Sequence, residues 1–137
     1  MADYEGHSFW DTEVWMLPAL LLLQPAALAL LDYRVARLGE ARALARASGH
    51  LGARYPWESA LTGREVCPEI ARDVREQEVH VSADISLALR LVASLGREKR
   101  WWQQGEGGTA CRVAWQVAQF WVSRAEYNIS VGAWEVR

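Results

Sequence analysis

YEGHSFWDTE, residues 4–13, runs directly into VWMLPALLLLQPAALALL, residues 14–31, and this junction decides the fold. The apolar half is long enough to suggest a membrane span. Asp11 and Glu13 precede it, however, and the Gln24-Pro25 step divides it into pieces too short to cross a bilayer. The pattern therefore predicts two soluble core helices joined by a tight turn, over residues 11–23 and 25–38.

The first half of the junction places an aromatic pair, Phe9-Trp10, directly before two carboxylates. An indole can pack on the C–H face of a sugar ring, and a carboxylate can accept its hydroxyl protons in charge-assisted hydrogen bonds. Trp10 and Asp11 are therefore candidate sugar-binding residues. The alternative is that Asp11 only caps the helix and Glu13 complements its dipole.

Beyond residue 38, helical periodicity returns in several further segments. Apolar residues recur at helical spacing from Val81 to Leu95, where Ser82 is a candidate cap, and from Thr109 to about Glu126. The stretch from His50 to Glu78 has no sustained period and predicts a long, ordered loop. The remaining expectations are a helix over 40–48, a basic and aromatic helix or turn over 97–104, a loop over 105–108 and one strand over 131–137.

These elements predict an all-α arrangement of helical hairpins with one terminal β-strand. Most of the length is helix, and the turns between helices are short, which favours an arc of a larger toroid. A small independent bundle is the alternative.

A second aromatic and acidic group occurs in the predicted loop, at Tyr55-Pro56-Trp57-Glu58. Pro56 fixes one dihedral and restricts Tyr55, so the loop can hold Trp57 and Glu58 in place. Trp57 can equally be a hydrophobic plug between helices. His80, just before the next helix, is expected to be a hydrogen-bonding residue of the structure rather than a ligand.

Composition excludes several classes of partner and cofactor. The 137 residues carry a net charge of −2, so neither nucleic acid nor an anionic membrane is an expected partner. Cys67 and Cys111 have neither metal-ligand nor disulfide-framework spacing, so we expect two buried thiols, a reducing compartment, no metal and no cofactor. The acidic, polar start does not resemble a signal peptide, which favours a cytoplasmic location.

The motifs, taken in order, resemble glycoside hydrolase family 65. The resemblance starts at Phe9-Trp10-Asp11-Thr12-Glu13 and covers the whole chain. Its further motifs are Asp32-Tyr33-Arg34, Gly52-Ala53-Arg54-Tyr55-Pro56-Trp57-Glu58-Ser59-Ala60, Glu65-Val66-Cys67-Pro68-Glu69, Gln77-Glu78-Val79-His80 and Phe120-Trp121 with Ser123-Arg124.

The resemblance implies an (α/α)6 barrel preceded by a β-sandwich, and an inverting reaction. It implies that Trp10 and Asp11 bind the glucosyl ring beside the scissile bond, with Trp57 and Glu58 as further substrate-binding candidates. The family's general acid is a Glu in a Pro-Asp-Glu motif that we expect after Arg137, so no catalytic residue is assigned here. Residues 1–137 would then be a partial catalytic domain, without the sandwich or the second half of the barrel.

Within the family, the loop motifs are most similar to members that remove glucose from glucosyl-galactosyl-hydroxylysine of collagen. We therefore expect part of an inverting α-glucosidase, inactive by itself, that binds a glucosyl disaccharide. A fragment of an acid trehalase or of a disaccharide phosphorylase is the alternative within the family. A non-catalytic helical interaction module is the alternative outside it, and exposed barrel faces would favour self-association.

Overall fold

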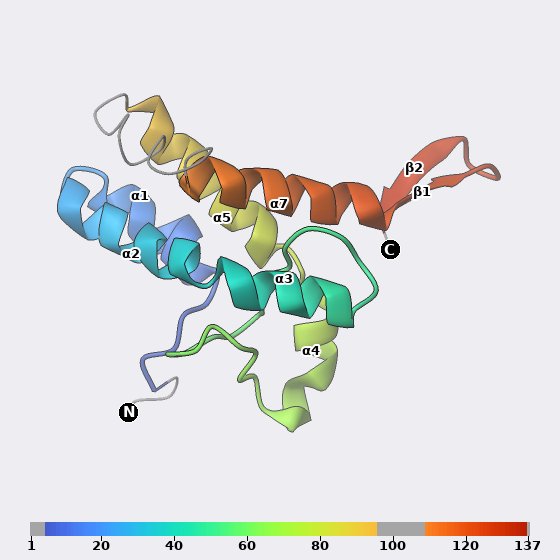
Figure 1. Ribbon diagram of the computed structural model, residues 1–137, viewed down its shortest axis with the longest axis horizontal. Helices are drawn as coiled ribbons and strands as arrows, with labels where there is room; N and C mark the ends of the chain where they lie inside the picture. Colours follow the sequence, from blue (N-terminus) through green and yellow to red (C-terminus); the bar gives the residue numbers. More distant parts are fainter. Residues whose placement is uncertain (1–4, 96–108, 137) are drawn as a thin grey trace.

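The computed structural model describes residues 5–95 and 109–136. The described parts are mainly helical, with one small β-hairpin, as Figure 1 shows. The segments predicted over 97–104 and 105–108 lie outside the described residues. The elements are η1 (Thr12–Met16), α1 (Leu17–Leu20), α2 (Gln24–Ala36), α3 (Leu38–Ala47), η2 (Glu69–Ala71), α4 (Arg72–Gln77), α5 (Val81–Ser94), α7 (Thr109–Arg124), β1 (Ala125–Asn128) and β2 (Ala133–Val136).

The apolar stretch folds into the predicted helical hairpin. A π-helical turn, η1, leads into α1, and a short turn after Leu20 leads into α2, where Pro25 occupies the first turn. Pro suits that position because the first amides of a helix have no intrahelical acceptor. Within the described residues, no helix is both long and apolar enough to cross a membrane.

The second helix of the hairpin ends earlier than its sequence pattern predicts. The chain leaves helical geometry at Arg37, whose φ is −102° and ψ 12°, and α3 begins directly after it. Gly39 therefore lies inside α3 rather than between two helices. The Arg37 side chain stacks 4.2 Å from the centre of the Tyr33 ring and donates a hydrogen bond to the Leu61 carbonyl, 2.8 Å away. These contacts hold the break in place.

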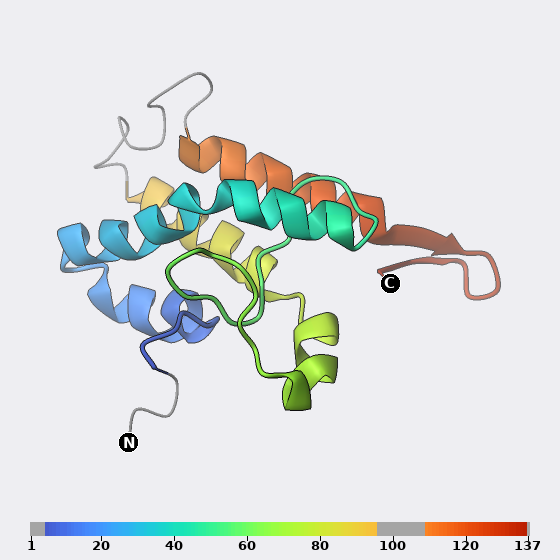
Figure 2. The same cartoon turned by 60° about the horizontal axis from the view of Figure 1, so that its bottom comes forward.

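The hydrophobic core forms around α5, which contacts η1, α2 and α7. In Figure 2, α3 lies beside α7, with α5 behind them. The predicted inward face of α5 is confirmed for Val81, Ile85, Ala88 and Val92, which are buried. Leu95, predicted on the same face, is 44% exposed at the end of the helix. Burial of one such aliphatic side chain stabilises a fold by about 1.5–3 kcal/mol. Ser82 does not cap α5; its Oγ accepts a hydrogen bond from the Tyr55 amide at 2.9 Å.

The segment predicted as a loop from His50 to Glu78 contains a short helix, α4, preceded by the 3-10 turn η2. Ion pairs between neighbouring turns support it, including Arg72 Nε to Glu76 Oε1 at 2.7 Å. A helix supported by such pairs shows no apolar residues at helical spacing, and for this reason the sequence pattern did not predict α4. The loop before it is joined to the N-terminal segment by a β-bridge between Ser8 and Ser59.

The chain end forms a hairpin rather than a single strand. β1 and β2 pair antiparallel, with Tyr127 opposite Trp134, and the hairpin projects from the end of α7 away from the helices (Figure 1). The sequence prediction placed the first half of β1, Ala125 and Glu126, at the end of the helix. Of the two thiols expected to be buried, Cys67 is buried and Cys111 is exposed on α7.

Candidate functional site

Two of the predicted sugar-binding residues lie against one imidazole. The Trp10 ring centre is 5.5 Å from that of His80, and the Trp57 ring centre is 5.7 Å from it. Trp10 precedes η1 and Trp57 lies in the long loop, so only the tertiary fold brings them together. Both indoles pack against the core while keeping part of their surface exposed. A partly exposed aromatic cluster of this kind can hold a flat, apolar ligand face.

His80 itself is held by two carboxylates. Its Nδ1 lies 2.6 Å from Asp84 Oδ2, one turn along α5, and its Nε2 lies 3.4 Å from Glu78 Oε2. The side chain of His80 remains 39% exposed. The sequence prediction of a hydrogen-bonding histidine at the start of the helix is confirmed, and the ring contacts with Trp10 and Trp57 extend it.

Asp11 is exposed at the start of η1, next to Trp10. It makes no side-chain capping hydrogen bond, so the alternative in which Asp11 is only a helix cap is wrong. An exposed carboxylate that follows a half-buried indole in the chain can accept hydrogen bonds from the hydroxyl groups of a ligand.

Glu58 differs from the other predicted residues, because it is buried and already paired. Its Oε1 lies 2.6 Å from His7 Nδ1, and the residue is 7% exposed. Glu58 therefore connects the loop to the N-terminal segment.

The loop that carries Trp57 is held in shape by a carboxylate that sequence analysis did not single out. Glu65 accepts hydrogen bonds from the amides of Trp57, Glu58 and Cys67, at 2.8, 3.0 and 3.1 Å. Amide bonds to a carboxylate are stronger than bonds between neutral groups. The sequence signal for this role was an acidic residue in the part of the loop that lies between Pro56 and Pro68.

The same region contains a buried ion pair that sequence analysis also missed. Arg34 donates to Glu13 from Nε and Nη2, at 2.7 and 3.0 Å, and further to Ser59 Oγ and the Phe9 carbonyl. Burial raises the pKa of Glu13, and the Arg34 guanidinium opposes that rise. Arg34 therefore joins α2, the N-terminal segment and the loop.

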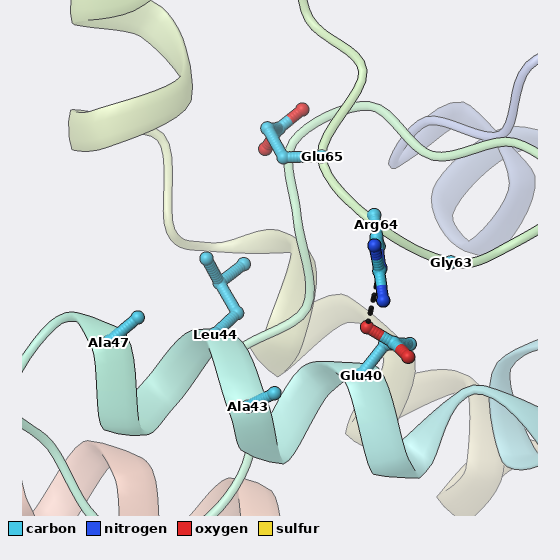
Figure 3. A pocket seen from close by; sticks show the side chains of 7 residues that line it. All are labelled: Glu40, Ala43, Leu44, Ala47, Gly63, Arg64 and Glu65. Atoms are coloured by element: carbon cyan, nitrogen blue, oxygen red, sulfur yellow. Dashed lines mark hydrogen bonds and ion pairs between the residues drawn. The ribbon is translucent and has the colours of Figure 1, made fainter.

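Among the described residues, three cavities flank these elements. The largest, about 600 Å³, lies between the N-terminal segment, α2 and the loop, and is lined by polar groups that include Ser8, Thr12, Tyr33 and Ser59. A second, of about 300 Å³, lies between α3 and the loop. Figure 3 shows this smaller cavity, where Arg64 points to Glu40 while the Glu65 carboxylate turns away.

None of these three cavities is lined by Trp10, Asp11, Trp57 or Glu58. Across residues 5–95 and 109–136, His, Cys, Asp and Glu side chains form no cluster of three that could hold a metal ion.

Comparison with known proteins identifies the family. The sequence profile of the glycosyl hydrolase family 65 central catalytic domain matches residues 2–137. A protein-glucosylgalactosylhydroxylysine glucosidase from Danio rerio is 43% identical over 128 residues, which are 92% of this chain and 19% of the relative. A kojibiose phosphorylase from Halothermothrix orenii is 37% identical over 146 residues, 98% of this chain and 18% of the relative.

The fold matches as well. A solved structure of a protein from the human microbiome, suggested to be a kojibiose phosphorylase, superposes with a TM-score of 0.76 at 25% identity. The match covers 97% of this chain and 19% of the other. The chain spans about one fifth of the length of the relatives it matches. It belongs to glycoside hydrolase family 65, within the central catalytic domain.

Proposed function

We propose that this chain forms the glucose-binding side of a family 65 glucosidase that acts on glucosyl-galactosyl-hydroxylysine of collagen. The observation that carries the proposal is the meeting of Trp10 and Trp57 on His80, with the exposed Asp11 directly after Trp10 in the chain. In this arrangement the indoles provide the apolar surface for a pyranose ring. Asp11 accepts hydrogen bonds from the ring's hydroxyl groups, and Glu58 supports the loop through His7.

The likeness to a glucosylgalactosylhydroxylysine glucosidase at 43% identity supports this substrate class. The likeness to a kojibiose phosphorylase at 37% identity supports a second candidate, a glucosyl disaccharide cleaved by phosphate. The two share the glucosyl half of the substrate. We therefore assign Trp10 and Asp11 to binding of the glucosyl half. Recognition of the leaving group is assigned to other residues, at which the two kinds of relative differ.

We further propose that the helices form an arc of an (α/α)6 barrel, and that other segments of a longer protein complete it. An apolar stripe on α7 that the rest of the described chain leaves exposed supports this arrangement. Trp115 and Val122 are 63% and 75% exposed, and Cys111 and Ala118 lie on the same face at helical spacing. A further helix packed on that stripe would bury it.

An inverting glycosidase needs one carboxyl group that protonates the leaving oxygen and another that activates water on the opposite face. We assign neither role to a residue of this chain. Glu13 is ion-paired with Arg34, and Glu58 is hydrogen-bonded to His7. Glu65 accepts hydrogen bonds from three backbone amides. The proposal is therefore binding without turnover by these 137 residues.

Binding is tested by titrating the 137-residue chain with glucose in a calorimeter. Trp10→Ala and Asp11→Ala should each weaken binding, and Asp73→Ala, an exposed acid on α4, is the matched control for Asp11. The loss of one charge-assisted hydrogen bond corresponds to about tenfold in affinity. Unchanged binding by Asp11→Ala would remove this residue from the site.

Turnover is tested with glucosyl-galactosyl-hydroxylysine and with kojibiose, each with and without inorganic phosphate. We expect no released glucose or glucose phosphate from the chain by itself. Release of either product would show that a general acid lies within these residues, and would overturn the assignment of no catalytic residue. A product that depends on phosphate would favour the second candidate.

A further inference from the structure

The His80 ring lies between two indoles that come from distant segments. Trp10 and Trp57 meet it in nearly the same way, with interplanar angles of 78° and 77°. Edge-to-face contacts of this kind are favourable and depend on the orientation of each ring. Because both indoles contact the same imidazole, the position of that imidazole determines how the two indoles are placed relative to one another.

The backbone and the two carboxylates fix this imidazole. His80 stands at the N-cap of α5, and its carbonyl accepts hydrogen bonds from the amides of Ala83 and Asp84, at 2.7 and 3.0 Å. The Asp84 carboxylate holds Nδ1, and the Glu78 carboxylate lies near Nε2. A ring hydrogen-bonded to a carboxylate at Nδ1 is restricted in its rotation about the side-chain bonds, as in histidines oriented by a carboxylate for catalysis or metal binding.

We propose that His80 is a positioning residue of the glucose site, and that it sets the spacing and tilt of Trp10 and Trp57. This inference rests on the proposed function. In this role His80 need not contact the sugar. His80 is fixed to α5 and contacts one indole of the loop and one of the N-terminal segment, so it restricts the motion of both indoles. Ligand binding then costs less conformational entropy, because the two rings are already ordered.

A histidine that only fills space would have different consequences, and the chain offers a matched control. The His50 ring also makes an edge contact with an aromatic residue, Phe120, at 5.6 Å and 84°. The same substitution at His50 removes an equivalent contact outside the proposed site. A loss of glucose affinity specific to His80 therefore separates positioning from packing.

The first experiment compares glucose affinity and the free energy of unfolding for His80→Ala, His80→Phe and His50→Ala. We expect His80→Ala to weaken glucose binding roughly three- to tenfold, the range that one or two aromatic contacts supply. His80→Phe keeps a ring and should restore part of the affinity. His50→Ala should bind as the parent chain does. Equal affinity of His80→Ala and the parent chain would overturn the inference.

A double-mutant cycle tests the coupling directly. Trp10→Phe and Trp57→Phe should be non-additive in the parent chain and additive in a His80→Ala background, because the imidazole links the two rings. Additivity in both backgrounds would contradict the inference, even if each substitution by itself weakened binding.

A ligand-free readout separates failure of this inference from failure of the proposed function. The indole N–H resonances of Trp10 and Trp57 should both shift in His80→Ala, while that of Trp134 on the hairpin stays in place. If the parent chain binds no glucose, the proposed function fails, and these two resonances alone decide whether His80 arranges the rings. Unshifted resonances would overturn that arrangement in either case.

Discussion

Glu13 and Arg34 form a bidentate ion pair in which both side chains are almost completely buried, at 0% and 1% exposure. The two residues come from different helices of the first hairpin. Two further acceptors, Ser59 Oγ and the Phe9 carbonyl, take hydrogen bonds from Nη1 and Nη2 of Arg34. The pair therefore connects three segments that carry the proposed site, and its removal should affect folding before it affects binding.

Removing one member of this pair should be strongly destabilising. Glu13→Gln or Arg34→Met should each cost about 3–5 kcal/mol in the free energy of unfolding, because the remaining group loses its partner in a dry environment. The double variant should lose less stability than the two single variants lose in sum. Chemical denaturation measures the free energy of unfolding of all three variants. Arg72→Met, which breaks the exposed pair with Glu76, is the control and should barely change stability. Simple additivity would show that the pair is not coupled.

Stability should fall at alkaline pH through Tyr55. Burial raises the pKa of its hydroxyl, which donates to the Arg34 carbonyl at 3.0 Å. Above about pH 10 the unfolded chain loses this proton while the folded chain keeps it. The unfolded state then binds fewer protons, so the free energy of unfolding should drop by about 1.4 kcal/mol per pH unit.

The test compares Tyr55→Phe with the parent chain between neutral and alkaline pH. The variant should be less stable at neutral pH by about 1 kcal/mol, the value of one hydrogen bond, and should show a flatter alkaline slope. Tyr127→Phe changes an exposed tyrosine of the hairpin and serves as the control. Parallel slopes for Tyr55→Phe and the parent chain would exclude this contribution.

Gly52→Ala should be far more harmful than Gly49→Ala. Both glycines have a positive φ, of +72° and +79°, and alanine there costs about 1–2 kcal/mol. At Gly52 an added Cβ would also lie 2.1 Å from the Gln116 carbonyl oxygen of α7, whereas nothing lies within 4 Å at Gly49. This overlap should add about 1–3 kcal/mol. Thermal unfolding of both variants measures the difference, and equal losses would contradict the close approach.

The exposed stripe on α7 should cause the chain to self-associate. Trp115→Glu with Val122→Lys should shift light-scattering masses toward the monomer, since charge on an apolar surface opposes association. Arg112→Ala, an exposed change on the same helix, should leave the distribution unchanged. A parent chain that is already monomeric at high micromolar concentration would count against the proposed barrel arc and in favour of an independent module.

Local sequence was sufficient to predict most of the helices. The inward faces of α5 and α7 followed from apolar residues at helical spacing, and the Gln24-Pro25 step placed the turn of the first hairpin. Helix α4 and strand β1 were missed for different reasons. α4 is supported by charged pairs that have no apolar period, and β1 exists only because β2 pairs with it.

The sequence by itself determined the family, the positions of the main helices and the candidate residues Trp10 and Asp11, because these depend on short motifs and on local periodicity. Only the tertiary structure decided that Glu13 pairs with Arg34, that Glu58 pairs with His7, and that His80 joins Trp10 to Trp57. These contacts join residues far apart along the chain. They form only when packing around α5 brings the loop and the N-terminal segment together, and no local pattern records that packing.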